Sequence, residues 1–125
     1  MVSYLLNSQE INAGNTDIKK SSIQALVTRT GLPVQHFLYG EKSLGSMIEA
    51  DSYKAVPSPR KDKYYKGGWI LEIHGSRDGG VIDAIMLEFP TEIRLEATDE
   101  ERHTFGVKLA KNIESFQSLF YNLVK

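Results

Sequence analysis

The sequence contains no cysteine and almost no net charge. The absence of Cys among 125 residues excludes disulfides, thiolate zinc sites and thiol nucleophiles, and it agrees with a reducing compartment. Fifteen Lys and Arg against sixteen Asp and Glu give a net charge of -1, so no broad positive field attracts nucleic acid or anionic lipid. The N-terminal residues have neither a basic region nor a long apolar run. We therefore expect a cytoplasmic protein without nucleic-acid or membrane partners.

The chain also lacks internal repeats, low-complexity tracts and long linkers. Its hydrophobic content of 41% is enough for a packed core, and its length is that of one domain. These features predict a single domain over residues 1–125. A chain of this size buries roughly two-thirds of its unfolded surface, which leaves little margin if an element is missing.

Two short stretches have the spacing of amphipathic helices. The first runs from Ser21 to Thr30, and Ser21 or Ser22 can serve as its N-cap. The second runs from Ser43 to about Ala50, and Ser43 can cap its free amides. We expect both stretches to be helices.

A third and longer helix is predicted at the C-terminal end of the chain. Thr98-Asp99-Glu100-Glu101 matches a capping box, in which the Thr hydroxyl and the Glu carboxylate satisfy each other's backbone donors. Apolar residues then recur three or four positions apart, and they are Phe105, Leu109, Ile113, Phe116, Phe120 and Leu123. We expect this stripe to pack on a sheet.

The region between these helices predicts the sheet itself. Trp69, Leu71 and Ile73 alternate with other residues, which is the period of a strand over residues 69–74. A glycine-rich turn covers residues 75–80, and Val81 to Phe89 is apolar almost throughout, as in a central strand covered on both faces. The predicted fold class is therefore α/β: a mixed sheet with a central apolar strand and an antiparallel hairpin, packed by the long C-terminal helix.

Glu88 is the clearest anomaly, because it lies inside the apolar run 81–89. An ionised carboxylate in such a run is costly unless it is paired. In one interpretation, burial raises its pKa and suits it to exchange protons with a substrate or a metal-bound water. In the other, it lies at the less covered strand end and pairs with Arg94 or a lysine.

Three further side chains near Glu88 are candidate ligand-binding residues. His74 closes the first predicted strand and can face a cleft shared with Glu88, although a hydrogen-bonded structural histidine is the interpretation we favour. Glu72 shares a face with His74, but a catalytic zinc ion needs three protein ligands. Arg77 lies in the glycine-rich turn, whose backbone amides can cradle an anion, although a plain hairpin loop is favoured.

Segments throughout the chain also form a recognisable combination. They are Tyr4-Leu5-Leu6, Ser43-Leu44-Gly45, Ala55-Val56-Pro57-Ser58-Pro59, Tyr65-Lys66-Gly67-Gly68-Trp69, His74-Gly75-Ser76-Arg77-Asp78-Gly79-Gly80, Ile82-Asp83-Ala84-Ile85-Met86-Leu87-Glu88-Phe89-Pro90 and Arg94. In this order they resemble the C-terminal half of N-formylglutamate amidohydrolase-like proteins, which belong with the zinc carboxypeptidase-like hydrolases. The resemblance implies a three-layer α/β fold. It gives Glu88 the place of the carboxylate that activates zinc-bound water, and it makes His74 and Arg94 cleft residues for a substrate carboxylate or transition-state charge.

The same resemblance implies that part of the family's site is missing. The family's zinc ligands precede the segment that matches Tyr4, and Met86-Leu87 stands where the family tends to carry Gln before the Glu. We therefore expect no cofactor, with zinc only if another chain completes the ligand set, and no zinc amidohydrolase activity of the isolated chain. The missing half would leave apolar sheet surface exposed, which predicts a homodimer.

Three functions remain open from the sequence. The leading hypothesis is a stand-alone, hydrolase-derived domain that binds a small anionic ligand around His74, Glu88 and Arg94. The second is an N-formylglutamate amidohydrolase-like metallohydrolase whose zinc ligands come from another chain. The third is a protein-interaction module that uses an uncovered sheet edge.

Overall fold

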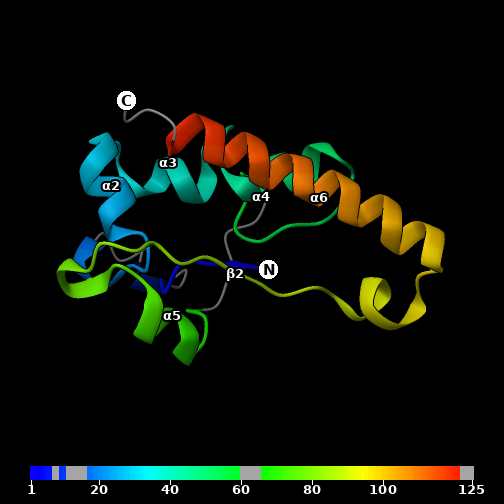
Figure 1. Cartoon of the computed structure of the whole chain (residues 1–125), viewed down its shortest axis with the longest axis horizontal. Helices are drawn as coiled ribbons and strands as arrows, with labels where there is room; N and C mark the ends of the chain where they lie inside the picture. Colours follow the sequence, from blue (N-terminus) through cyan, green and yellow to red (C-terminus); the bar gives the residue numbers. More distant parts are fainter. Residues whose placement is uncertain (7–8, 11–16, 60–65, 122–125) are drawn as a thin grey trace.

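The computed structural model describes residues 1–6, 9–10, 17–59 and 66–121, and within these ranges it shows a helix-rich protein with one small sheet (Figure 1). The elements, in chain order, are β1 (Val2–Ser3), η1 (Ile18–Lys20), α2 (Gln24–Thr30), α3 (Val34–Tyr39), α4 (Leu44–Ala50), α5 (Trp69–His74), η2 (Arg77–Gly79), β2 (Met86–Leu87), η3 (Glu92–Glu96) and α6 (Asp99–Phe120). Helix α6 runs over α3 and α4, and α5 lies on the opposite side of the N-terminal strand (Figure 1). None of the helices in the described ranges is both long and apolar enough to cross a membrane.

The predicted caps of α4 and α6 are confirmed. At the start of α4, the backbone N–H of Ser46 donates to Ser43 Oγ at 3.2 Å. At the start of α6, the N–H of Glu101 donates to Thr98 Oγ1 at 3.2 Å, and the N–H of Thr98 donates to Glu101 Oε2 at 2.7 Å. Both helices begin where their capping residues predict, because these signals act within one turn.

Helix α6 packs mainly on other helices, and the small sheet lies across the shared core from it. Phe120 meets Phe37 of α3 edge to face, with ring centroids 5.0 Å apart. Nearer the start of the helix, Phe105 meets Tyr53 in the same way at 4.8 Å. The predicted apolar stripe is therefore correct over the described helix. It packs on α3, α4 and the segment after α4, and it shares its core with Val2 of β1 and Leu87 of β2. Leu123 lies outside the described residues.

The apolar core lies between α6 and the N-terminal strand. Its buried members are Val2, Tyr4, Leu6, Ile23, Leu26, Val34, Phe37, Leu38, Leu44, Ile48, Ala55, Phe116 and Phe120. Close packing of α4 depends on Gly45, since a Cβ added there would lie 1.9 Å from the carbonyl oxygen of Pro57. The segment around Pro57 can therefore approach α4 only because this position has no side chain.

The sheet differs from the prediction in its partner and its extent. Strand β2 pairs antiparallel with β1, and Val2 lies opposite Leu87. The predicted hairpin is wrong, and so is the predicted central strand, because residues 81–82 are exposed and residues 83–87 are only half-buried. An apolar run without alternation does not specify which strand it pairs with or how many faces are covered.

Residues Trp69–His74 form the helix α5, so the strand predicted there is also wrong. Trp69, Leu71 and Ile73 fit a strand period, whereas Trp69, Ile70 and Ile73 fit one helical face, so periodicity alone cannot decide between the two. In the helix, Leu71 is the buried residue, and its carbonyl accepts the N–H of Gly75 at 3.0 Å. Gly67, with a φ of 100°, lets the chain pass close to Leu71, where a Cβ would lie 2.6 Å from Leu71 Cδ1. A helix satisfies these backbone groups within the segment, without a neighbouring strand.

The N-terminus of α2 is capped by residues that are distant in the sequence. Its N-cap residue is Ile23, which makes no side-chain cap, so the predicted caps are wrong. Instead, the N–H of Ala25 donates to Ser76 Oγ at 2.8 Å, and the N–H of Leu26 donates to Asp83 Oδ1 at 3.1 Å. These acceptors lie 51 and 57 residues away along the chain. Helix α2 is thus completed by tertiary contacts.

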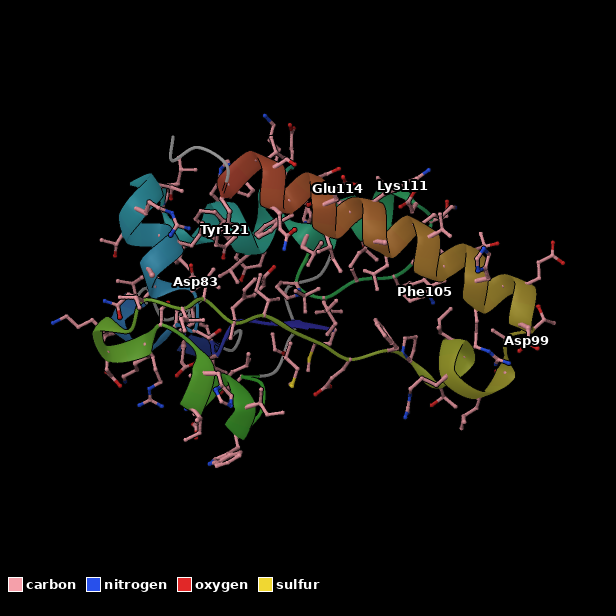
Figure 2. The ribbon with its side chains drawn as sticks, viewed as in Figure 1. Asp83, Asp99, Phe105, Lys111, Glu114 and Tyr121 are labelled. Atoms are coloured by element: carbon pink, nitrogen blue, oxygen red, sulfur yellow. The ribbon has the colours of Figure 1, made fainter. Side chains whose placement is uncertain are left out.

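The carboxylate of Asp83 is buried: its side chain is only 3% exposed, although the residue as a whole is half-buried. Ser76 Oγ donates to its Oδ1 at 2.6 Å, and the Arg29 guanidinium lies 3.7 Å from its Oδ2. Tyr121, at the end of α6, also hydrogen-bonds to it, and burial, together with this negative charge, raises the pKa of the Tyr121 hydroxyl. We call these four residues the Asp83 cluster; Figure 2 shows Asp83 and Tyr121 close to the base of α2. The carboxylate also faces the positive end of the α2 dipole.

Candidate functional site

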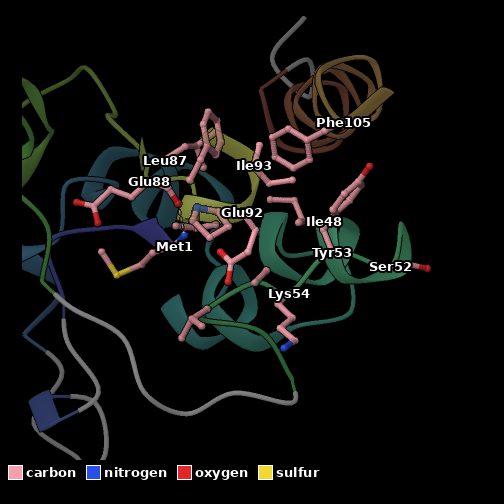
Figure 3. A pocket seen from close by; sticks show the side chains of 15 residues that line it. Met1, Ile48, Ser52, Tyr53, Lys54, Leu87, Glu88, Glu92, Ile93 and Phe105 are labelled. Carbon is pink, nitrogen blue, oxygen red and sulfur yellow. Dashed lines mark hydrogen bonds between the residues drawn. The ribbon is translucent and has the colours of Figure 1, made fainter. Parts of the chain in front are cut away.

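A groove of about 560 Å³ opens between α4, the first turns of α6 and the chain that leads from β2 into η3 (Figure 3). We call it the β2–η3 groove. Its apolar lining includes Ile48, Val56, Leu87, Phe89, Ile93 and Phe105. This size and this largely apolar lining are typical of a site for a small ligand.

Phe105 forms the aromatic wall of the groove. Its ring meets Tyr53 at 4.8 Å and Phe89 at 5.2 Å, both edge to face. Ile48 and Ile93 point toward this ring from α4 and η3 (Figure 3). Rings that meet edge to face hold one another in place, so the apolar wall has a defined shape.

Backbone hydrogen bonds place η3 over the groove. After β2, the N–H of Glu88 donates to the carbonyl of Met1 at 2.9 Å. The carbonyl of Pro90 then accepts the N–H of Ile93 at 3.2 Å and that of Arg94 at 3.1 Å, which turns the chain. The turn carries Glu92 and Ile93 to the groove, the first at the rim and the second within the apolar lining.

Three charged side chains lie at the rim: Lys54, Glu88 and Glu92. All three are exposed, and within the described part of the chain neither Lys54 nor Glu92 forms an ion pair. Burial lowers the pKa of the Met1 amino group, and the nearby Glu88 carboxylate opposes part of this effect. Lys54 and Glu92 therefore offer charges to a ligand without first having to break an internal ion pair, whereas Glu88 already interacts with the Met1 amino group.

A second hollow of about 550 Å³ adjoins the groove and shares Tyr53, Glu92 and Ile93 with it. We call it the acidic hollow, because its lining includes the four carboxylates of Glu92, Glu96, Glu100 and Glu101. The pKa of Glu101 is lowered by the hydrogen bonds it accepts from Thr98. The side of the groove at η3 is consequently negative.

Glu88 lines the groove but is not the buried carboxylate that the sequence predicted. Its side chain is exposed, because β2 has only two residues and Glu88 follows it at the groove rim. A two-residue ladder with β1 leaves the strand end open to solvent. The interpretation in which burial raises the pKa of Glu88 is therefore wrong, and its exposure agrees with the alternative of a less covered strand end. Glu88 lines the β2–η3 groove, which is not the cleft expected with His74 and Arg94.

The other predicted site residues lie elsewhere. Glu72 contacts Arg77 at 3.8 Å near α5, and His74 is exposed on the same helix. Arg94 is exposed on η3, beside the start of α6 and away from α5 (Figure 1). The structure thus brings Glu72 and Arg77 together, but it does not join His74, Glu88 and Arg94 in one cleft.

The residues present do not fit a zinc site. His36, His74 and His103 lie on α3, α5 and α6, and His36 packs its ring against Phe37 and Phe120. In the described ranges, no three His, Asp or Glu side chains lie together in a way that could hold a metal ion. We therefore derive no chemistry through zinc.

Sequence reasoning missed both Asp83 and most of the groove. Asp83 stands in the same apolar run as Glu88, so an acidic residue among apolar neighbours was the signal for both. The groove left no such signal, because its walls come from separated stretches that include Ile48, Tyr53 and Phe105. No spacing rule connects residues that only tertiary packing brings together.

Comparison with known proteins identifies no family for this arrangement. No protein-family model, curated protein sequence or solved structure matches the chain.

Proposed function

We propose that this chain is a binding domain for a small amphipathic molecule that combines an apolar body with a positively charged nitrogen. The body would occupy the β2–η3 groove, and the nitrogen would lie at the rim near Glu88 and Glu92. The observation that carries this proposal is an apolar groove of about 560 Å³ with carboxylates along one side. Such pockets are the usual sites of ligand binding in proteins.

Apolar contact would supply most of the affinity. Burying a group the size of a Phe side chain contributes about 1.5–3 kcal/mol. An exposed ion pair contributes about 0–1 kcal/mol, because water and salt screen it. The groove should therefore retain a ligand of either charge weakly, and the carboxylates should decide which charge is preferred.

The distribution of charge favours a positive ligand. Lys54 and the Met1 amino group are the positive charges of the groove lining, whereas Glu88, Glu92 and the rest of the acidic hollow supply five carboxylates. The anionic ligand expected from the sequence would have to be held by these two ammonium groups against a larger number of carboxylates. Descent from an N-formylglutamate amidohydrolase-like protein, and a zinc site completed by another chain, both remain predictions.

The test compares two probes of similar shape and opposite charge, 2-phenylethylamine and 3-phenylpropionate. Each is titrated into the isotopically labelled chain, and amide chemical shifts are followed by NMR. We expect shifts at Tyr53, Ile93 and Phe105 with both probes, and an affinity several-fold higher for the amine. Tighter binding of 3-phenylpropionate would favour the anionic ligand, and shifts confined to other elements would contradict the site.

Two variants separate the rim charges from the apolar lining. Glu92→Gln keeps the side-chain shape and should weaken binding of 2-phenylethylamine several-fold while leaving 3-phenylpropionate unchanged or tighter. Glu114→Gln is the matched control, because Glu114 is an exposed carboxylate on α6 outside the groove lining. Equal effects of the two variants on amine binding would contradict a local role of Glu92.

A further inference from the structure

One face of α5 presents three large apolar side chains to solvent. Trp69 is 70% exposed, Ile70 is 58% exposed and Ile73 is 56% exposed. Spacings of three and four residues place them on one side of the helix, and Leu71, on the other side, is buried and anchors it. We call the exposed side the α5 face.

A grouped surface of this kind is unusual for a protein that acts alone. Single exposed apolar residues are ordinary, but a contiguous group that includes a tryptophan is typical of an interaction surface. Tryptophan is also among the residues that most often dominate binding energy at interfaces. Helix α5 projects from the side of the molecule opposite α6, where its exposed side is accessible to a partner (Figure 1).

The charges beside the α5 face are of both signs and lie close together. Glu72 is 3.8 Å from Lys66 and 3.8 Å from Arg77. A membrane surface would select a predominantly basic rim, which this is not. These groups are paired within one copy, but their side chains are partly exposed. A copy related by a two-fold axis can therefore exchange these contacts, placing its carboxylate against the basic groups of the first, so a mixed rim is complementary to itself.

We propose that the α5 face is the contact surface of a homodimer, with a second copy of this chain as its occupant. In a two-fold dimer the same residues of both copies are buried, so the total apolar area removed from water is twice that of one α5 face. Stable interfaces cover about 800 Å² on each partner, and three side chains fill only part of that area. The dimer should therefore be weak, with a dissociation constant on the order of 100 μM.

The experiment uses the full chain and two independent readouts. Sedimentation velocity from about 5 to about 500 μM brackets the expected dissociation constant and should show mass rising from monomer toward dimer. Trp69 is the only tryptophan in the sequence, so its fluorescence reports on the face itself. We expect its emission to shift to shorter wavelength over the same concentration range. A constant monomer mass, or a dimer without a change in Trp emission, would overturn the proposal.

Substitutions locate the contact. Ile73→Gln keeps the fluorescent reporter and should raise the dissociation constant of the dimer at least several-fold. Trp69→Gln removes the reporter, so its effect is measured by sedimentation velocity alone, and we expect a similar rise in the dissociation constant. Leu95→Gln is the matched control, because Leu95 is 74% exposed but lies on η3. Circular dichroism of each variant checks that the helices are retained. Loss of dimer with Leu95→Gln but not with Ile73→Gln would assign the interface to another surface. This inference is independent of the groove, whose lining does not include the α5 face.

Discussion

Asp83 holds three separate parts of the chain together. Its carboxylate accepts one hydrogen bond from a backbone N–H of α2 and another from the Ser76 hydroxyl. It also interacts with Arg29 of α2 and with Tyr121 at the end of α6. These partners come from three different stretches of sequence: α2, the turn that contains Ser76, and the end of α6. Because the side chain is almost fully buried, loss of its charge would leave these donors poorly satisfied.

Asp83→Asn should therefore lower the free energy of unfolding by about 2 kcal/mol, the range for buried hydrogen bonds to a charged group. Urea unfolding followed by circular dichroism measures this loss. Asp78→Asn is the control, since Asp78 is an exposed partner of Arg77 at 2.9 Å, and surface ion pairs contribute about 0–1 kcal/mol. Equal losses in the two variants would show that the Asp83 cluster does not stabilise the fold as described.

The pair Asp83 and Glu88 also shows the limit of residue-level prediction. Both are acidic residues in one apolar run, where an ionised carboxylate is costly unless it is paired. The sequence analysis selected Glu88 for this position, whereas the buried carboxylate is that of Asp83. Which of the two is buried depends on the position of the two-residue strand within the run, because Asp83 precedes β2 and Glu88 follows it. That position is set by pairing with Val2, far away in the sequence.

At the scale of elements, α6 is the helix most completely specified by its own residues. Its capping box lies within one turn, and its apolar stripe repeats along the helix. The hydrogen bonds from Thr98 lower the pKa of Glu101. A carboxyl whose pKa is lower in the folded state stabilises that state above its unfolded pKa, and the contribution is lost as the pH falls through the folded value.

Thr98→Ala should accordingly destabilise the chain by about 1 kcal/mol at neutral pH. The difference from the parent chain should narrow at acidic pH, once the pH has fallen below the lowered pKa of Glu101 and its carboxylate is protonated in both chains. Thermal unfolding at several pH values tests this. Thr104→Ala, within the same helix, should be neutral or slightly stabilising because Ala has the higher helix propensity. A pH-independent difference between Thr98→Ala and the parent would contradict the role given to Glu101.

Elements with local signals were predictable, and those that depend on distant partners were not. The starts of α4 and α6 follow from Ser43 and Thr98, which act on neighbouring amides. The segment Trp69–His74 fits a helix and a strand equally well by pattern. The pairing of β2 with β1 could not be predicted because no local feature points to Val2 as its neighbour.

At the scale of the whole molecule, the β2–η3 groove exists only after the chain has folded. Its walls combine Ile48 of α4, Tyr53, the chain after β2 and Phe105 of α6. Sequence reasoning placed Glu88 at a cleft but expected His74 and Arg94 as its neighbours. The neighbours are instead apolar and aromatic residues, because α5 folds away from this side of the molecule.

The separation of the three histidines leads to a prediction about metal binding. His36, His74 and His103 lie on different helices, so the isolated chain has no preformed set of three ligands within its described part. We expect one equivalent of zinc to leave the melting temperature of the chelator-treated chain unchanged. A saturable rise, reversed by chelator, would instead support the metallohydrolase alternative. Calorimetric titration of zinc into the same sample gives the stoichiometry.

The remote capping of α2 has a consequence for the order in which the protein is made. As the chain emerges from the ribosome, α2 appears about fifty residues before the side chains that complete its first turn. Short helices without such partners are marginal in water. Helix α2 should therefore remain only partly formed during synthesis and become fixed when Ser76 and Asp83 arrive, whereas α6 carries its own start signal and can form as soon as it is released.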